Sequence, residues 1–253
     1  MVGRLGLWRT HRSFCRTGAL NRETLTRINQ ARRDARAIVR ATNLATGEDR
    51  LLDPSADKSP LGEAAAGAAR ADTSGPAVIE GQSWFLAVFN PPLDLVIIGA
   101  VHVAQPLATM AALTGFGVRI IDPRTAFATS ARFPNVKLSN AWADEALAKE
   151  PLGPRSALVA LAHDPKLDDP GLIIALKSQC FYIGALGSKK THAGRLQRLK
   201  KEGFSEQQLS RLHGPIGLDI GARSPAEIAV SILAEITQIL RGSRRSQTDP
   251  TKN

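Results

Sequence analysis

Residues 95–122 read LVIIGAVHVAQPLATMAALTGFGVRIID, and this stretch decides the fold. The run Leu95–Ile98 is apolar throughout, as expected of a short strand buried on both faces of a parallel sheet. Gly99 then allows a tight turn, Val103–Leu113 has helical character, and Val118–Ile121 is a second apolar run. A strand, tight turn, helix and second strand in this order predict a unit of the dinucleotide-binding kind.

Strands and helices continue to alternate toward the C-terminus. Further strands are expected at 157–161 and 181–183, and helices at 142–147, 170–176, 191–201 and 205–211. A last, long helix begins with Ser224 as cap, Pro225 in its first turn and Glu227 three residues after the cap. Alternation of this kind predicts an α/β fold with a doubly wound, mostly parallel, Rossmann-like sheet.

A small N-terminal region precedes this domain. The spacing of Leu25, Ile28 and Ala31 indicates one face of a helix. The stretch 38–42 is either a continuation of that helix or a strand paired with 50–52 across a turn containing Gly47. Residues 53–76 are rich in Ala, Gly, Ser, Asp and Pro, and we expect a mobile linker there. Another strand is expected at 83–89.

The predicted organisation is therefore a basic, disordered arm at 1–22, a small region at 23–90 that includes the linker 53–76, a Rossmann-like domain at 91–242 and a disordered tail at 243–253. Residues 1–22 contain Arg and no acidic residue, which is typical of a mitochondrial transit peptide. A start codon placed upstream of the true start, or a plain basic arm, accounts for the same composition.

The net charge of +10 is concentrated at the two ends of the chain. Residues 1–41 carry +8 and residues 241–253 carry +3, which leaves −1 for the centre. Nucleic-acid binding needs basic groups arranged on a folded face, so we expect no nucleic-acid partner. The longest apolar runs fall well short of the ~20 residues that span a bilayer, so we expect no membrane partner.

The chain has two cysteines, Cys15 and Cys180, without metal-ligand or redox spacing. Two isolated thiols exclude a disulfide framework and suit the reducing cytoplasm, which is the expected location. Cys180 lies in an apolar run and is expected to be a small buried residue rather than a nucleophile.

Ligands of open parallel sheets bind beyond the carboxyl ends of the strands, so the turns there are candidate sites. The first turn is Gly99, Ala100, Val101 and His102, where the helix that follows directs backbone N–H groups at an anion. Val101 stands where the usual G-x-G-x-x-G pattern has the glycine that lets a pyrophosphate approach. The turn is thus either an anion site, with His102 as an extra donor, or a vestigial one. A bulky residue at Gly99 is expected to block the ligand and leave the fold intact.

Asp122 and Arg124 follow the second strand. Asp122 lies 23 positions after Gly99, close to the ~20 expected of an acid that binds ribose hydroxyls. Arg124 is placed to meet a phosphate, unless the two residues form only a loop ion pair. Arg132 is a further basic residue on this loop.

Two later turns carry similar chemistry. His163 and Asp164 open a stretch with three carboxylates after the third strand, which is a candidate binding site, although Asp168 or Asp169 can equally serve as a helix cap. A metal site there is conceivable, but no residue is assigned as a metal ligand. Gly187, Ser188 and Lys190 form an anion-binding turn without the Walker spacing, and Asp219 lies between Gly217 and Gly221. Catalytic residues are not assigned.

Five segments, taken together, resemble the XdhC/CoxI family of xanthine dehydrogenase accessory proteins. They are LVIIGAVHVAQ at 95–105, IDPR at 121–124, HDPKLDDP at 163–170, YIGALGS at 182–188 and PIGLDIGA at 215–222. The similarity extends over roughly residues 91–241. Members of this family commonly begin with a domain that has a Ser-Gly-Gly-Cys type segment, and none precedes Leu95 here, so 20–89 is expected to be the N-terminal region of a shorter branch.

The resemblance implies a helper for molybdenum hydroxylases that binds the molybdenum cofactor, as molybdopterin or its cytosine dinucleotide, assists its sulfuration and delivers it to the apoenzyme. It implies the hydroxylase apoenzyme as partner, with a cysteine desulfurase as a second partner, and a homodimer. The cofactor-binding residues expected are those of the four turns: Gly99, Ala100, Val101, His102, Asp122, Arg124, His163, Asp164, Gly187, Ser188, Lys190 and Asp219. An NAD(P)-dependent oxidoreductase and a non-catalytic scaffold on a degenerate Rossmann fold stay open as alternatives.

Overall fold

The computed structural model describes residues 22–34 and 36–242. The chain divides between Pro91 and Pro92 into two compact units, and each is described by itself. Of the arm predicted for residues 1–22, only Arg22 lies within the described residues, and it opens a helix. The tail predicted for residues 243–253 lies outside them.

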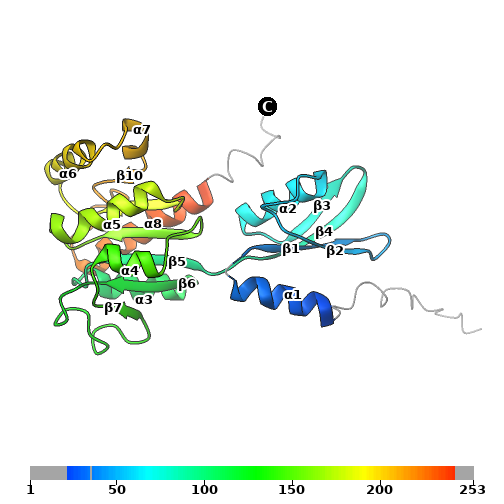
Figure 1. Cartoon of the computed structure of the whole chain (residues 1–253), viewed down its shortest axis with the longest axis horizontal. Coiled ribbons are helices and arrows are strands. Elements are labelled where there is room, and N and C mark those ends of the chain that lie inside the picture. The colour runs from blue at the N-terminus through cyan, green and yellow to red at the C-terminus, as the bar shows by residue number, and fades with distance from the viewer. Residues whose placement is uncertain (1–21, 35, 243–253) are drawn as a thin grey trace, which may run out of the picture. The chain divides into compact units, whose positions relative to one another are not determined.

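The N-terminal unit is a four-stranded antiparallel sheet with two helices (Figure 1). The sheet order is β2-β1-β4-β3. The elements are α1 Arg22–Arg33, β1 Ile38–Asn43, β2 Asp49–Leu52, α2 Pro60–Ala71, β3 Gly75–Ile79 and β4 Gln82–Phe89. Val39 pairs with Leu52, so the hairpin interpretation of this region is confirmed and the helix ends before it.

The two helices of this unit pack on opposite faces of the sheet. Successive side chains of a strand point to opposite faces, so both faces present apolar residues to a helix. Val39 of β1 packs in one cluster with Leu61 and Ala65 of α2. Its neighbour Ile38 packs in another cluster with Ile28 of α1. Each helix thus covers apolar side chains that would otherwise face water.

The prediction that residues 53–76 form a linker is wrong. Helix α2 occupies 60–71, and strand β3 begins at Gly75. Ser59 caps α2 by accepting a hydrogen bond from the N–H of Gly62, and Pro60 stands at the first turn. The segment lacks large apolar residues, but Leu61, Ala65 and Ala69 are buried against Trp84 and Leu86 of the sheet. Small side chains let the helix lie close to the strands, which the composition alone did not indicate.

The C-terminal unit is a six-stranded parallel sheet in the order β10-β9-β8-β5-β6-β7. Its strands are β5 Leu93–Ile98, β6 Phe116–Ile121, β7 Lys137–Ser139, β8 Ser156–Ala160, β9 Tyr182–Ala185 and β10 Leu212–His213. Its helices are α3 Ala104–Leu113, α4 Ala143–Lys149, α5 Pro165–Lys177, α6 Lys189–Lys201, α7 Glu206–Leu209 and α8 Pro225–Gly242. This strand order is that of the Rossmann fold, so the predicted fold class is confirmed.

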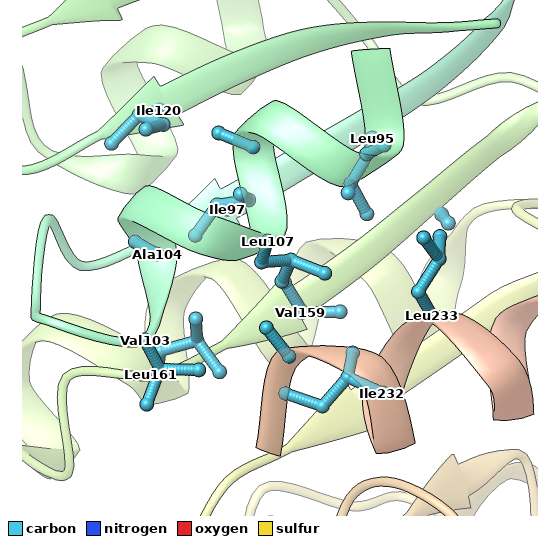
Figure 2. Packing of buried hydrophobic residues seen from close by; sticks show 14 of the residues in the cluster. Leu95, Ile97, Val103, Ala104, Leu107, Ile120, Val159, Leu161, Ile232 and Leu233 are labelled. Carbon is cyan, nitrogen blue, oxygen red and sulfur yellow. The ribbon is translucent and has the colours of Figure 1, made fainter. Parts of the chain in front are cut away.

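Helices cover both faces of this sheet (Figure 1). On one face, Leu95 and Ile97 of β5 pack in one cluster with Leu107 of α3 and Ile232 of α8, as Figure 2 shows. On the other face, Val96 and Ile98 pack with residues of α4 and α5. All four residues of the run 95–98 are buried. Because both faces of the strand are covered, its sequence is apolar at every position instead of alternating between apolar and polar residues.

Helix α5 begins five residues earlier than predicted, at Pro165 instead of Pro170. Asp164 is its cap, so the expectation that Asp168 or Asp169 caps the helix is wrong. Pro170 lies inside the helix and cannot donate a hydrogen bond to the carbonyl of Lys166. Because Pro165 occupies the first turn, where no donor is needed, the helix starts there.

Among residues 22–34 and 36–242, none of the helices combines the length and the apolar character that a membrane crossing requires.

The cap of α2 provides a test of the N-terminal unit. Replacing Ser59 with Ala removes the acceptor for the N–H of Gly62 and should destabilise α2 by about 1 kcal/mol. Hydrogen exchange of the α2 amides should be faster in Ser59→Ala than in the wild type, by the factor that corresponds to this loss of helix stability. Ser59→Asp retains a capping oxygen and should exchange like the wild type. Equal exchange in Ser59→Ala and the wild type would show that the cap does not stabilise this helix.

Candidate functional site

The candidate site lies at the carboxyl edge of the six-stranded sheet, at the point where the order of successive strands reverses. From β5 the chain passes through α3 to β6 on one side, whereas β8 and β9 lie on the other. The turns after β5 and β8 therefore face each other at the topological switch point, where doubly wound sheets bind ligands. Leu161 donates a hydrogen bond to the carbonyl of Ile98 across this point, at 2.9 Å.

Gly99 begins the first turn and is required by the fold itself. Its φ of +99° lies in the left-handed region, and a Cβ there would lie 2.8 Å from the backbone nitrogen of Ala162. The expectation that a bulky residue at Gly99 would spare the fold is therefore wrong. The turn after β5 and the turn after β8 are in contact because no side chain separates them.

The rest of the first turn contains backbone N–H groups without a partner among the described residues. Neither Val101 nor His102 donates a hydrogen bond from its backbone there. Val101 is partly buried and packs against the apolar core, while His102 is exposed. Val103 occupies the cap position of α3 without a side-chain hydrogen bond. The start of α3 is thus uncapped by the described side chains, as the anion-binding hypothesis requires.

Asp122 does not present an open carboxylate. Its side chain is fully buried, and its oxygens accept hydrogen bonds from the N–H of Ala100 at 2.8 Å and from the N–H of Arg124 at 3.0 Å. The guanidinium of Arg124 donates two more, at 2.9 and 2.7 Å. Burial by itself would raise the pKa of Asp122, but the hydrogen bonds outweigh it and the pKa is lowered. Asp122 positions the first turn and Arg124. Its oxygens are therefore not free to bind ribose hydroxyls, which differs from the expectation.

Arg124 and Arg132 surround the ring of Phe127. The guanidinium of Arg124 lies 4.4 Å from the ring centroid and that of Arg132 lies 6.0 Å from it. Arg132 also donates to the carbonyl of Ala100, at 2.8 Å. Two cationic side chains are thus anchored beside the first turn, one through Asp122 and one through the backbone of Ala100.

The turn after β8 contains His163 and Asp164. Asp164 caps α5 and accepts from the N–H of Lys166 at 2.9 Å. His163 has a φ of +62°, which is unusual for a residue with a side chain. Partial burial and the charge of Arg195 lower the pKa of His163. His163 and Asp164 are exposed at the switch point, but within the described residues no cluster of three His, Cys, Asp or Glu side chains is arranged to hold a metal.

Beneath this turn lies a buried ion pair, Asp168 with Arg195. Their side chains are each 2% exposed, and Arg195 Nη2 lies 3.8 Å from Asp168 Oδ2. Asp168 Oδ1 accepts from the N–H of Ala162 at 3.1 Å, and Arg195 Nη2 donates to the carbonyl of Leu186 at 2.9 Å. Burial raises the pKa of Asp168 to about 6, against the lowering effects of Ala162 and Arg195.

The turn after β9 contains Gly187, Ser188 and Lys190. Gly187 has a φ of +144°, and Ser188 caps α6 by accepting from the N–H of Thr191 at 3.1 Å. Lys189 and Lys190 are exposed in the first turn of α6. The turn is therefore present with Ser188 as helix cap, and its binding of an anion stays a prediction.

The segment after β10, which contains Asp219, is anchored to α8. Gly217 packs against α8, where a Cβ would lie 2.3 Å from the hydroxyl of Ser231. The N–H of Gly217 donates to Glu235 at 2.8 Å, and the hydroxyl of Tyr182 donates to the same carboxylate. Asp219 itself is exposed, and within the described chain no hydrogen bond or ion pair connects its side chain to the other site residues.

Glu235 therefore connects the sheet, the loop and the helix. Burial by itself would raise its pKa, but hydrogen bonds from His213, Tyr182 and the N–H of Gly217 outweigh burial, and the pKa is lowered. His213 stacks on the ring of Tyr182, with 5.0 Å between the ring centroids. A carboxylate with these partners stabilises the fold when it is ionised.

The sequence interpretation missed Arg195 and His192. Both are on α6, and Arg195 lies on the same face of the helix as Leu199, four residues later. Helical spacing from Leu199, which is buried, would have indicated that Arg195 is buried as well. The Nδ1 atom of His192 and the Nε and Nη1 atoms of Arg195 are buried without a hydrogen-bond partner among the described residues.

Gly99 can be tested against a glycine of α6. Gly99→Ala should lower the free energy of unfolding by on the order of 1–3 kcal/mol, because of its positive φ and the collision with Ala162. Gly194→Ala should raise it by about 0.5–1 kcal/mol, since Gly194 is helical and a Cβ there would lie 4.0 Å from the side chain of Arg198. Urea unfolding curves check both values. An unchanged stability of Gly99→Ala would contradict the close approach of the two turns.

Glu235 can be tested through the pH dependence of stability. Glu235→Leu should lower the free energy of unfolding at pH 7 by on the order of 2–3 kcal/mol, because Tyr182 and Gly217 lose their acceptor. The stabilisation depends on a lowered carboxyl pKa, so it is present above about pH 4.5, the unfolded value, and is lost as the pH falls below it.

Glu235→Gln keeps an acceptor and does not titrate, so it serves as the control. We expect it to lose less stability than the wild type when the pH is lowered from 5 to 3 in urea titrations. A parallel loss in both proteins would show that Glu235 does not carry this pH dependence.

Comparisons with known proteins identify the family of this chain. The family model of the XdhC Rossmann domain matches residues 95–236. A probable xanthine dehydrogenase subunit of Bacillus subtilis (strain 168) is 36% identical over 155 residues, 61% of this chain and 45% of that protein. The molybdenum cofactor insertion chaperone PaoD of Escherichia coli (strain K12) is 32% identical over 151 residues, 60% of this chain and 41% of that protein.

A crystal structure of a xanthine dehydrogenase from Bacillus halodurans is similar with a TM-score of 0.65. It is 24% identical and covers 90% of this chain and 66% of that chain, so it supports the fold alone. The chain spans less than half the length of the two curated relatives. The family resemblance drawn from the five motifs is confirmed. Since the domain model covers more than half of the 253 residues, the chain belongs to the XdhC Rossmann domain family.

Proposed function

We propose that this protein is a maturation factor for a molybdenum hydroxylase of the xanthine dehydrogenase type, which binds the molybdenum cofactor and delivers it to the apoenzyme. The observation that carries the proposal is the similarity to a protein named molybdenum cofactor insertion chaperone. The family model covers the turns after β5, β6, β8, β9 and β10, where the candidate ligand residues lie.

The donors at the carboxyl edge fit the phosphate of such a cofactor. The N–H groups of Val101 and His102 donate no hydrogen bond within the described residues, and Lys189 and Lys190 are exposed at the start of α6. Buried nitrogens of Arg195 lack partners within the described residues, which is the state that a polar ligand nearby would relieve. The residues present therefore fit a ligand with a phosphate group, in its molybdopterin or cytosine dinucleotide form.

The chain's own residues bind and orient this ligand. Gly99 brings the turns after β5 and β8 together, Asp122 holds Arg124 in a fixed orientation, and the lysines of α6 attract the phosphate. The cofactor, when bound, supplies the molybdenum centre that the hydroxylase uses. NAD(P) is a weaker candidate, because this fold usually binds the ribose of NAD(P) through an acid at this position, and Asp122 already accepts four hydrogen bonds from the protein. The cytosine dinucleotide form would likewise have to bind without a contact between its ribose and Asp122.

Sulfuration of the cofactor needs a sulfur source outside the described residues. The free thiol of Cys180 is buried, and burial raises its pKa, so little reactive thiolate forms there. We therefore propose that a cysteine desulfurase supplies the sulfur while this protein holds the cofactor. Cys15 lies outside the described residues. The expected assembly is a homodimer in the cytoplasm.

The proposal is tested by incubating the purified protein with molybdenum cofactor, NADP and NAD in separate samples. Retained pterin fluorescence and a raised melting temperature are expected with the cofactor alone. Retention of NADP without pterin would contradict the proposal and favour an oxidoreductase, and retention of none would favour a scaffold.

The lysines of α6 provide a matched pair of variants. Replacing Lys189 and Lys190 with Ala should weaken cofactor binding about tenfold, which corresponds to ~1.4 kcal/mol. Replacing Lys200 and Lys201, at the other end of the same helix, removes the same charge away from the site and should leave binding unchanged. Equal losses in both double variants would indicate a general charge effect rather than a site.

A further inference from the structure

The buried pair of Asp168 and Arg195 is incompletely bonded. The N–O distance of 3.8 Å is longer than a hydrogen bond, although both side chains are 2% exposed. Asp168 Oδ2 and the Nε and Nη1 atoms of Arg195 have no hydrogen-bond partner among the described residues. A buried cation in this state is costly, because its charge is compensated only through space.

The pair lies under two turns of the candidate site. Asp168 accepts from the N–H of Ala162, in the turn after β8. Arg195 donates to the carbonyl of Leu186, immediately before Gly187 and the N-terminal end of α6. The guanidinium is therefore directed at the turn that begins α6, so its positive charge adds to that of the helix terminus.

We propose that the turn between β9 and α6 binds an anionic group of the phosphate or sulfate class, that Arg195 supplies buried positive charge beneath it, and that Asp168 controls this charge by gaining or losing a proton. When Asp168 is ionised it compensates Arg195, and the turn attracts an anion weakly. When Asp168 is protonated, the charge of Arg195 acts on the anion in a medium of low dielectric constant.

The inference rests on the proposed function only in assigning this anion to the phosphate of the cofactor. The binding of a simple anion, and its dependence on Asp168, follow from the charges and contacts of the turn itself. The two proposals can therefore fail independently.

Several charged groups face Asp168, and the test must distinguish their contributions to the pH dependence from that of Asp168. Asp169, on the same helix, is paired with Arg198 at 2.7 Å. The remaining groups are Arg195 and Arg198 of α6, Arg124 after β6, and His163 and Asp164 in the preceding turn. The arginines keep their charge over the range from pH 5 to 7.5, and only Asp168, His163 and the nearby His192 are candidates to titrate in it.

The pKa values of these groups support the proposal. Burial raises the pKa of Asp168 to about 6, whereas burial and Arg195 lower the pKa of His163 and of His192. Asp168 is therefore expected to take up its proton within the tested range, as the pH falls from 7.5 to 5.

The test uses sulfate as the probe, since sulfate stays a dianion between pH 5 and 7.5. Calorimetric titration of the full chain should show about tenfold tighter binding at pH 5 than at pH 7.5. Asp168→Asn should bind sulfate at pH 7.5 as tightly as the wild type does at pH 5, with little further change. Asp169→Asn, the matched control, and His163→Gln should both keep the wild-type pH dependence.

A pH dependence that survives in Asp168→Asn, or that disappears in His163→Gln, would overturn the proposal. If Asp168→Asn does not fold, carbon-13 NMR of the Asp168 carboxyl group in the wild type decides instead. Saturating sulfate should raise the midpoint of its titration by about one pH unit, and an unchanged midpoint would overturn the proposal. Sulfate binding without cofactor binding would contradict the proposed function alone, and the reverse would contradict this inference alone.

Discussion

The site depends on the contact between Gly99 and the backbone of Ala162. A Cβ at residue 99 would lie 2.8 Å from the backbone nitrogen of Ala162, so no side chain fits there. The positive φ of residue 99 excludes most other residues independently. This contact joins the turns after β5 and β8, which come from strands that are neighbours in the sheet and distant in the chain. Ligand donors from both turns then share one edge. The glycine therefore serves the assembly of the site, whether or not a ligand touches it.

Two buried aspartates of this edge show how environment decides the role of a residue. Asp122 accepts four hydrogen bonds, two from backbone N–H groups and two from Arg124, and its pKa is lowered in spite of burial. Asp168 is as deeply buried but lies 3.8 Å from its arginine, and its pKa is raised to about 6. The first aspartate is a fixed structural anion, while the second changes its charge within an accessible pH range.

The functional interpretation combines these charges with family membership. The XdhC Rossmann domain accounts for the C-terminal unit, and the antiparallel sheet of the N-terminal unit precedes the matched residues 95–236. Cationic side chains lie near the switch point. The carboxylate of Asp122, at the position that usually recognises a ribose, is instead hydrogen-bonded within the protein. The recognition proposed for this edge is therefore through a phosphate rather than through a ribose.

The sequence by itself determined the sheet, because a run buried on both faces must be apolar at every position, as Leu95–Ile98 is. It also determined the turns that carry polar residues, and the family, from five motifs in order. Only the tertiary structure decided that 60–71 is a helix, because small residues gain burial from a sheet that the local sequence does not contain. It alone decided that Asp122 is locked and that Asp168 meets Arg195. Asp122 and Arg124 are 2 positions apart in the chain, whereas Asp168 and Arg195 are 27 positions apart. No local pattern in the sequence indicates a contact over the longer separation.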